Sequence, residues 1–268
     1  MCRLLGYLGS AIEIDRLIYK PEHSLVVQSY QPKEMTAGLL NADGFGVGWY
    51  HPTKDTNPYT YKNVIPIWND LNLPQLSRYV ETQCMLAYVR SATPPLVIDI
   101  SNCQPFNNEH ILFIHNGFIN NFRRTLYRPI RNSLDDYSYQ LIHGTTDSEH
   151  IFALLVQELR SSPGIPLEVA LRDTINKLNQ LAKAHNVYFS SNIIISNGKQ
   201  LVASRYANRS PVPTLYCLRD EPLYPNSVIV ASEPLFTGNW NSCPENSLIT
   251  VGEDLEVHIS PISERGNS

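Results

Sequence analysis

Ile111-Leu112-Phe113-Ile114-His115 is a nearly continuous apolar run, and Asn192-Ile193-Ile194-Ile195-Ser196 is a second one. Apolar runs that do not alternate with polar residues are typical of strands covered on both faces. Other short runs rich in β-branched and aromatic residues predict strands at 3–8, 45–50, 85–90, 201–206, 227–232 and 255–260. The sequence therefore predicts a β-sheet that is covered on both faces.

Two segments between these strands carry leucine stripes at helical spacing, one at 151–159 and the other at 167–181. A weaker helix candidate follows Asn121 and is expected to end or kink at Pro129. The proline-rich run at 210–225 is expected to be a loop. Because strands dominate both halves of the chain and helices cluster in its middle, packed sheets with helices outside are favoured over alternating βαβ units.

The composition argues against several classes of function. The chain has 268 residues, of which 43% are hydrophobic and 17% charged, and its formal net charge of -4 gives no bias towards nucleic acid. No apolar run approaches the roughly 18 residues of a membrane span. The five cysteines are scattered without a C-x-x-C pair, which argues against disulfides and thiolate zinc sites. One domain spanning 1–268 and a reducing cytoplasm are expected.

Cys2 is a candidate nucleophile, because initiator methionine is generally removed ahead of a small side chain. The mature chain, 2–268, would then carry a thiol and a free α-amino group on one residue. The pKa of a free thiol is about 8.5 and that of an α-amino group about 7.7–8.0, so the amine can accept the thiol proton. A cysteine at position 2 taken alone is more often accidental, and the interpretation depends on the other motifs.

His115-Asn116-Gly117 follows the apolar run at 111–114. Asn116 can offer its side-chain NH₂, and Gly117 can offer a backbone N–H that no side chain blocks. Two such donors at a strand end would form an oxyanion hole. The simpler alternative is a β-turn, because Asn-Gly is a strong hairpin signal, and the two interpretations are compatible.

Arg90 and Asp147 are candidates for binding the charged groups of an amino acid. Arg90 ends a predicted strand, where its guanidinium can hold a carboxylate through two hydrogen bonds, although a surface arginine is the commoner finding. Thr146 and Glu149 have capping-box spacing and Asp147 could itself cap the helix, so a structural role is as plausible as ammonium binding. As a pair, Arg90 and Asp147 would select free glutamine or a γ-glutamyl end over a residue inside a peptide.

Neither phosphate nor metal binding is supported by the sequence. The glycine-rich segment at 41–50 matches neither a Walker loop nor a dinucleotide fingerprint, so its glycines are expected to permit a turn and close packing. The histidines form no H-x-x-x-H or H-E-x-x-H pattern, which leaves a metal site without support. No metal and no organic cofactor are expected.

Taken together, the motifs resemble those of class II glutamine amidotransferases, which are N-terminal-nucleophile hydrolases. The matching segments agree in order and spacing; they are Met1-Cys2-Arg3-Leu4-Leu5-Gly6-Tyr7, Asp43-Gly44-Phe45-Gly46, Arg90-Ser91-Ala92-Thr93, His115-Asn116-Gly117, Thr146-Asp147-Ser148-Glu149 and Ala231-Ser232-Glu233-Pro234-Leu235. The resemblance implies an α+β fold, a four-layer αββα sandwich of two antiparallel sheets. It also implies Cys2 as nucleophile, Asn116 and Gly117 as oxyanion donors, and substrate binding by Arg90, Ser91, Thr93, His115 and Asp147.

Within this family, three segments are most similar to the ergothioneine-pathway amidohydrolase: the opening motif, His23-Ser24-Leu25 with Gln28-Ser29, and Asn102-Cys103-Gln104-Pro105-Phe106. That resemblance implies hydrolysis of γ-glutamyl-hercynylcysteine sulfoxide, a small-molecule substrate. This chain departs from the family pattern at Tyr88 and Gln104, two positions close to the substrate-binding segments where family members often have histidine. Alternatives are a glutaminase subunit that supplies ammonia to a synthetase partner, a glutathione-type γ-glutamyl hydrolase, and a catalytically silent amino-acid-binding module. A homo-oligomer is equally compatible with the sequence.

Overall fold

The two apolar runs lie side by side in the computed structural model, which describes residues 2–35, 38, 40–51, 55–92 and 98–262. β6 (Ile111–Ile119) pairs antiparallel with β7 (Phe189–Ser196) along its length. Within the described residues they belong to a six-stranded sheet, whose order is β13 (Val257–Pro261), β12 (Ser247–Val251), β8 (Leu201–Arg205), β7, β6 and β5 (Phe106–Asn108).

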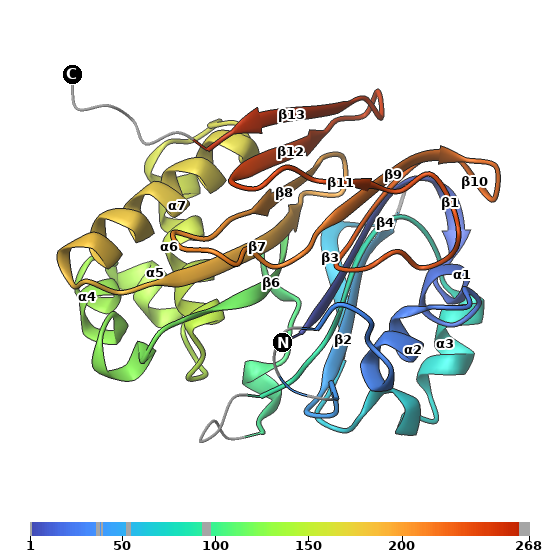
Figure 1. Ribbon diagram of the computed structural model, residues 1–268, viewed down its shortest axis with the longest axis horizontal. Helices are drawn as coiled ribbons and strands as arrows, with labels where there is room; N and C mark the ends of the chain where they lie inside the picture. The colour runs from blue at the N-terminus through green and yellow to red at the C-terminus, as the bar shows by residue number, and fades with distance from the viewer. Residues whose placement is uncertain (1, 36–37, 39, 52–54, 93–97, 263–268) are drawn as a thin grey trace.

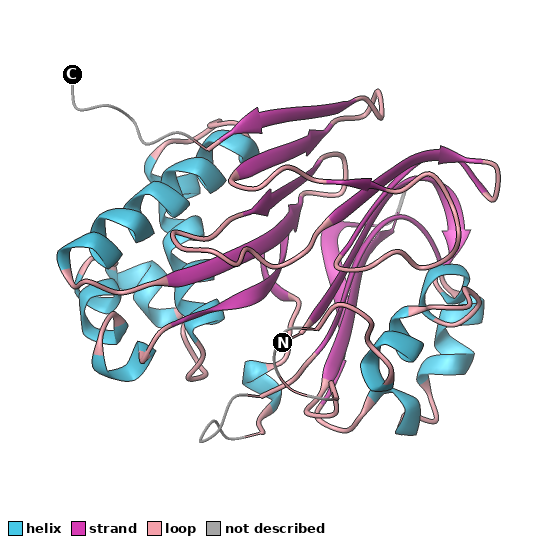
Figure 2. Cartoon of the chain, viewed as in Figure 1, coloured by secondary structure: helices cyan, strands magenta, loops and turns pink. Residues whose placement is uncertain are grey.

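The second sheet has β1 (Arg3–Glu13) at its centre. Its seven strands within the described ranges run in the order β11 (Asn241–Ser242), β9 (Tyr216–Glu221), β10 (Tyr224–Ala231), β1, β4 (Glu81–Val89), β2 (Phe45–His51) and β3 (Asp55–Asn63). All the strand pairs in both sheets are antiparallel. The two sheets face each other in the middle of the molecule, with helices on both outer sides (Figures 1 and 2).

The apolar run at 192–196 is continuous because its side chains enter two different cores. Ile194 points between the sheets, where it packs with Leu4 and Leu86 of the opposite sheet. Ile193 and Ile195 point the other way, into a core shared with the helices α4 (Tyr127–Asn132), α6 (Asp147–Ser161) and α7 (Leu167–Ala184). The prediction of strands covered on both faces is confirmed.

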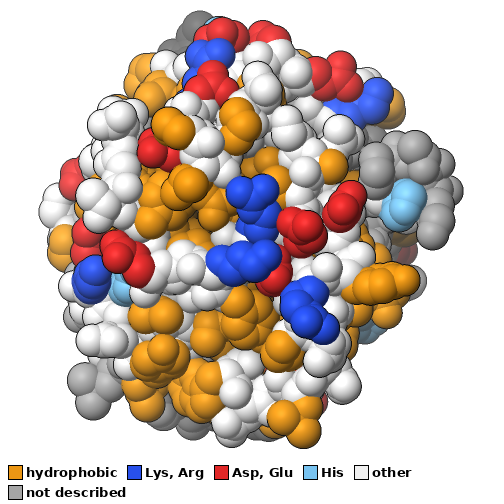
Figure 3. Space-filling model, turned by 90° about the vertical axis from the view of Figure 1, so that its right-hand side faces the viewer, with side chains coloured by type: hydrophobic (Ala, Val, Ile, Leu, Met, Phe, Trp, Pro, Cys, Tyr) orange, Lys and Arg blue, Asp and Glu red, His pale blue; other side chains and the backbone are white. Residues whose placement is uncertain are grey.

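Three short helices cover the outer face of the other sheet: α1 (Asp15–Ile18), α2 (Leu25–Tyr30) and α3 (Leu73–Tyr79). Leu17, Leu25 and Leu73 pack there against Leu5 and other strand residues. With α4 to α7 on the opposite side, including α5 (Asp136–Gln140), the four-layer αββα sandwich is confirmed. Figure 3 views the molecule from the right-hand side of Figure 1, where acidic, basic and apolar side chains are intermingled.

Two predictions that rested on proline residues were wrong. The proline-rich run at 210–225 contains β9 and the start of β10, and Pro225 is tolerated because the β9–β10 register is irregular between Tyr224 and Val228. Pro129 neither ends nor kinks a helix. It lies in the first turn of α4, where backbone N–H groups have no helical partner and a proline loses no hydrogen bond.

Among the described residues, no helix combines the length and the apolar character that crossing a membrane would require.

Candidate active site

Cys2 lies at the start of β1, beside the end of β4. The Tyr88 hydroxyl donates a hydrogen bond to Cys2 Sγ at 2.9 Å, and the backbone N–H of Ser91 donates a longer one at 3.4 Å. All five cysteines are free, but Cys2 is the one that is partly exposed, whereas the other four are buried. The sulfur of Cys2 is therefore both accessible and hydrogen-bonded.

Cys2 opens into a cavity of about 780 Å³. Most of the residues predicted to form the site share its lining: Cys2, Arg90, Ser91, His115, Gly117 and Asp147. Thr93 lies outside the described residues. These residues lie just before β1, just after β4, in β6 and at the start of α6, so the fold gathers segments that are far apart in the sequence.

Asn116 and Gly117 do not lie in a turn or at a strand end, contrary to the sequence interpretation. β6 continues past them to Ile119, and Asn116 pairs with Asn192 while Gly117 pairs with Ser191. A Cβ at Gly117 would lie 2.0 Å from the Ser190 carbonyl oxygen, so glycine is required by the close approach of β7. The Asn-Gly turn preference is overridden by the pairing of the two strands.

The Asn116 side chain does not line the cavity directly, but it points towards the layer that contains Cys2. Side chains alternate along β6, and Asn116 falls on the face of Leu112 and Ile114, whose core between the sheets Cys2 also contacts. Asn116 is 2% exposed, and within the described part of the chain its amide makes no hydrogen bond. Its amide atoms are not among the fully buried unpaired polar atoms of the described residues, so the NH₂ group remains available to an acceptor.

Arg90 is buried rather than on the surface. Its Nη1 donates to the Asp43 carbonyl oxygen at 3.2 Å, and its backbone N–H donates to Gly44 O at 2.8 Å. Asp43 in turn accepts a 2.7 Å hydrogen bond from the Ala92 N–H, so the glycine-rich segment holds the end of β4. Gly44 has φ +117°, which confirms the turn predicted there. Arg90 Nη2 has no partner among the described residues, which leaves one edge of the guanidinium available.

Asp147 is the first residue of α6, but it does not cap the helix. Thr146 is the N-cap and accepts from the Glu149 N–H at 3.2 Å, whereas Glu149 accepts from the backbone of His143 and Gly144, so the capping box is only half formed. Asp147 Oδ2 accepts from the Ile119 N–H at 2.8 Å and ties α6 to the end of β6. A carboxylate has about four acceptor positions, so capacity for an ammonium group remains.

His115 is a buried link between β6 and its neighbours. Its Nδ1 lies 2.8 Å from Ser148 Oγ and its Nε2 3.4 Å from Ser190 O. Burial lowers the pKa of His115, which favours the neutral ring, with Nε2–H donating to Ser190 and Nδ1 accepting from Ser148. Among the described residues, no three His, Cys, Asp or Glu side chains are placed to hold a metal ion.

Gln104 and Tyr88, the two departures from the family pattern, both support this site. The Gln104 side-chain amide exchanges hydrogen bonds with the backbone N–H and C=O of His115, so it fixes β6 just before Asn116. Tyr88 donates to the sulfur of Cys2, and its pKa is raised by burial and by the neighbouring thiol, which keeps the phenol protonated. The sequence marked both positions as unusual but did not indicate their partners.

We expect Tyr88→Phe to slow alkylation of Cys2 at pH 7 by about 3- to 10-fold, because one hydrogen bond to the sulfur contributes roughly 1 kcal/mol. The rate of modification by iodoacetamide, followed by intact mass, measures this effect. Tyr50→Phe is the matched control, since Tyr50 is also buried between the sheets but bonds to the His110 and Ser196 carbonyl oxygens. Equal alkylation rates in wild type and Tyr88→Phe would contradict the role of the phenol.

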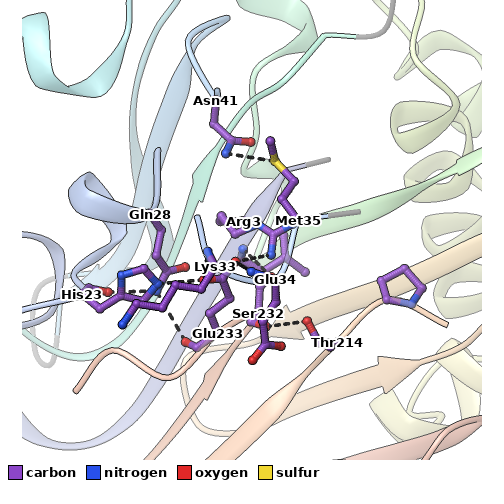
Figure 4. Close-up of polar contacts among 12 residues, drawn as sticks. Arg3, His23, Gln28, Lys33, Glu34, Met35, Asn41, Thr214, Ser232 and Glu233 are labelled. Atoms are coloured by element: carbon purple, nitrogen blue, oxygen red, sulfur yellow. Dashed lines mark hydrogen bonds and ion pairs between the residues drawn. The ribbon is translucent and has the colours of Figure 1, made fainter. Parts of the chain in front are cut away.

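Several motif residues without an assigned role converge on Glu233 (Figure 4). The Glu233 carboxylate accepts from Arg3 Nη1 at 2.8 Å and lies 2.7 Å from His23 Nε2. The backbone N–H groups of Lys33 and Glu34 donate to the same carboxylate at 2.8 and 3.0 Å. The Glu233 cluster, defined as these five residues, therefore joins the residue after Cys2 to the segment at 33–34.

Glu233 is 1% exposed. Burial alone would raise its pKa, but the hydrogen bonds from His23 and the two backbone N–H groups, with the charge of Arg3, outweigh that effect and lower it. The neighbouring Ser232 accepts from the Leu4 N–H at 2.9 Å, so the start of β1 is held at two successive residues. The sequence placed Arg3, His23 and Glu233 in three separate motifs, which did not reveal that they meet.

Glu233→Gln is expected to reduce the free energy of unfolding at pH 7 by roughly 1–3 kcal/mol, because charge-assisted hydrogen bonds to a buried carboxylate are lost. The folded-state pKa of Glu233 is lowered, so its contribution is complete above the unfolded pKa, about 4.3, and is lost as the pH falls through the folded value. The difference between wild type and variant should therefore disappear in acid. Urea denaturation at several pH values measures it.

The control for this prediction is Glu256→Gln, which removes an exposed carboxylate that pairs with Arg219 through two contacts of 2.6 and 2.7 Å. Solvent screens such a pair, so little change in stability is expected. A Glu233→Gln protein as stable as Glu256→Gln at neutral pH would show that the Glu233 cluster contributes no net stability.

The chain is similar to known proteins over most of its length. A family model described as class-II glutamine amidotransferases matches residues 1–233. A Saccharomyces cerevisiae protein named probable glutamine amidotransferase DUG3 is 30% identical, over 98% of this chain and 84% of its own length. A Mycobacterium tuberculosis protein named gamma-glutamyl-hercynylcysteine sulfoxide hydrolase is 31% identical, over 94% of this chain and 93% of its own.

A solved structure with a similar fold is that of a glutamine aminotransferase class-II domain protein from Silicibacter pomeroyi. It superposes with a TM-score of 0.72 at 25% sequence identity, and the match covers 97% of this chain and 99% of that one. The similarity therefore extends over both sheets and both helical layers of the described chain.

Proposed function

Because the chain belongs to the class II glutamine amidotransferases, we propose that it hydrolyses γ-glutamyl amides with Cys2 as the nucleophile. One observation carries this proposal. The partly exposed sulfur of Cys2 opens into the same cavity as an incompletely paired guanidinium, a carboxylate at a helix start and the strand residue Gly117. Nucleophilic attack on the γ-carbonyl of a glutamyl side chain needs a nucleophile, groups that hold the substrate and an oxyanion donor, and these residues can supply them.

In the proposed reaction the Cys2 thiol transfers its proton to the α-amine of the same residue, and the sulfur attacks the γ-carbonyl carbon. The resulting oxyanion would be stabilised by the Asn116 NH₂ and the Gly117 N–H. Collapse forms a γ-glutamyl thioester, breaks the C–N bond and releases the amine, which takes up a proton. Water then attacks the thioester, so that glutamate leaves and the thiol is restored.

Arg90 and Asp147 are proposed to hold the α-carbon groups of the glutamyl unit. The unpaired Nη2 of Arg90 suits a carboxylate, and Asp147 retains acceptor capacity for an ammonium group. Ser91 and His115 line the same cavity and are proposed to bind the substrate. Ser91 would do so through its backbone, and His115 by shaping the site. Thr93, which lies outside the described residues, is proposed to bind substrate because the family resemblance implies it.

For the substrate, we propose γ-glutamyl-hercynylcysteine sulfoxide. The proposal is supported by the mycobacterial relatives of that name, which are 29–31% identical to this chain over at least 94% of its length. A second candidate is the release of ammonia from glutamine. It is favoured by the yeast relative, whose name is that of a probable glutamine amidotransferase and whose identity to this chain is 30%.

The test is glutamate release from a panel containing γ-glutamyl-hercynylcysteine sulfoxide, glutathione and glutamine, with acid quenching to trap the thioester on Cys2. We expect a Cys2-linked γ-glutamyl adduct in the intact mass and the highest kcat/KM for the sulfoxide. A protein that binds these compounds without releasing glutamate would instead be a silent binding module. Highest kcat/KM for glutamine would support the ammonia-supplying alternative.

A further inference from the structure

The cavity extends beyond the groups assigned to the glutamyl unit. One of its walls is formed by the end of β6 and the short 3₁₀ turn η3 (Phe122–Arg124), namely Phe118, Asn120, Asn121, Phe122, Arg123 and Arg124. At about 780 Å³, the cavity lies in the upper part of the range of about 300–1,000 Å³ that ligand pockets span. There is room for a leaving group larger than ammonia.

The charges that line this cavity are unbalanced. Arg90, Arg123 and Arg124 are basic, whereas Asp147 is the one acidic side chain in the described lining. The α-carboxylate and α-ammonium of a glutamyl unit would match Arg90 and Asp147, one group each. Two guanidinium groups then remain without a counterpart.

The Arg123 and Arg124 side chains have no partner among the described residues. Both are exposed, and within the described ranges neither guanidinium makes a hydrogen bond, an ion pair or a ring contact. Most other arginines have such a partner; Arg131, for example, bonds to His150 and lies over Tyr127. Arg123 and Arg124 are therefore available to an anionic ligand.

The backbone that carries these two arginines is well anchored. Asn121 adopts a left-handed conformation with φ 51°, and its carbonyl oxygen accepts from the Arg124 N–H at 2.8 Å. The Thr125 hydroxyl closes the turn by donating to the Asn120 carbonyl oxygen at 2.9 Å. Phe122 is 9% exposed and packs edge-on against His150. The turn thus presents two free guanidinium groups from a fixed base.

We infer that the amine released from the γ-glutamyl substrate carries a carboxylate, which Arg123 and Arg124 bind. The substrate class is then a γ-glutamyl amino acid or peptide, not glutamine. This inference rests on the proposed function, and it assigns Arg123 and Arg124 as specificity residues for the leaving group. Neither residue takes part in the cleavage of the amide.

The test compares γ-glutamylglycine with γ-glutamylglycinamide, which differ in whether the leaving amine ends in a carboxylate or a neutral amide. Wild type should favour γ-glutamylglycine in kcat/KM by about 5- to 30-fold, as expected for two solvent-accessible ion pairs. The double variant Arg123→Gln/Arg124→Gln should reduce that ratio to about one while leaving kcat/KM for γ-glutamylglycinamide unchanged. Arg128→Gln is the matched control, because Arg128 is exposed in α4 and outside the cavity lining.

Calorimetric binding to the Cys2→Ala protein separates this inference from the proposed function. Tighter binding of γ-glutamylglycine than of its amide, lost in the double variant and kept in Arg128→Gln, supports the inference even if turnover is absent. An unchanged preference in the double variant, or equal binding and turnover of the two compounds by wild type, overturns it. In that case Cys2-dependent glutamate release would still support the proposed function.

Discussion

Cys2→Ala should reduce γ-glutamyl amide turnover by roughly 10⁵-fold or more, the size of effect seen when an attacking nucleophile is removed. The reaction proposed for this chain has no second route to the thioester, because that intermediate is formed on the Cys2 sulfur. Folding should be little affected, since Cys2 is partly exposed and contributes little to the core between the sheets. Glutamate release under saturating substrate and a thermal melt measure the two quantities.

The matched control is Cys217→Ala, which removes a buried thiol from the same core. That variant is expected to lose stability but to keep its kcat. A third protein, with one residue inserted between Met1 and Cys2, keeps the thiol but converts the α-amine into an amide. It should lose activity nearly as completely as Cys2→Ala. Full activity in the insertion variant would exclude the α-amine as the base, and full activity in Cys2→Ala would exclude Cys2 as nucleophile.

The parts of the fold that could be predicted are those whose pattern is local and long. The unbroken run at 192–196 and the leucine stripe at 167–181 each predicted the right element, because burial on two faces and amphipathic spacing leave direct traces in the sequence. The helices α1 to α3 were missed because they have 4 to 7 residues each, too few for a periodic pattern. Their layer is stabilised by contacts with the sheet and not by helix propensity.

Most of the residues predicted for the candidate site line one cavity, but their geometry could not be predicted. The family relationship inferred from motif order is confirmed by the match over residues 1–233. Motif order does not say that Gly117 lies within a strand, because the pairing partner Ser191 is distant in the sequence. Motif order also does not indicate that Arg3, His23 and Glu233 are in contact, because the three residues belong to different segments of the chain. Such long-range contacts are set by packing, which a single sequence does not display.

Asn116→Ala is expected to lower kcat by about 10²- to 10³-fold with little change in KM, the typical effect of removing one oxyanion donor. The Asn116 side chain is 2% exposed, and its NH₂ group has no hydrogen-bond partner in the described chain, on the face of β6 that looks towards the layer of Cys2. An NH₂ group without an acceptor in the protein can gain one when the oxyanion forms, and this places its expected effect on kcat.

Two further variants distinguish this role from simple filling of space. Asn116→Asp retains the shape but replaces the donor with a carboxylate that repels an oxyanion, so its kcat should be at least as low as that of Asn116→Ala. Asn120→Ala removes an amide from the lining of the same cavity, without a proposed oxyanion contact, and should retain kcat within a few fold. If Asn116→Asp kept wild-type kcat, the oxyanion would have to be held by Gly117 and other groups, since a carboxylate cannot donate the hydrogen bond that the proposal assigns to this position.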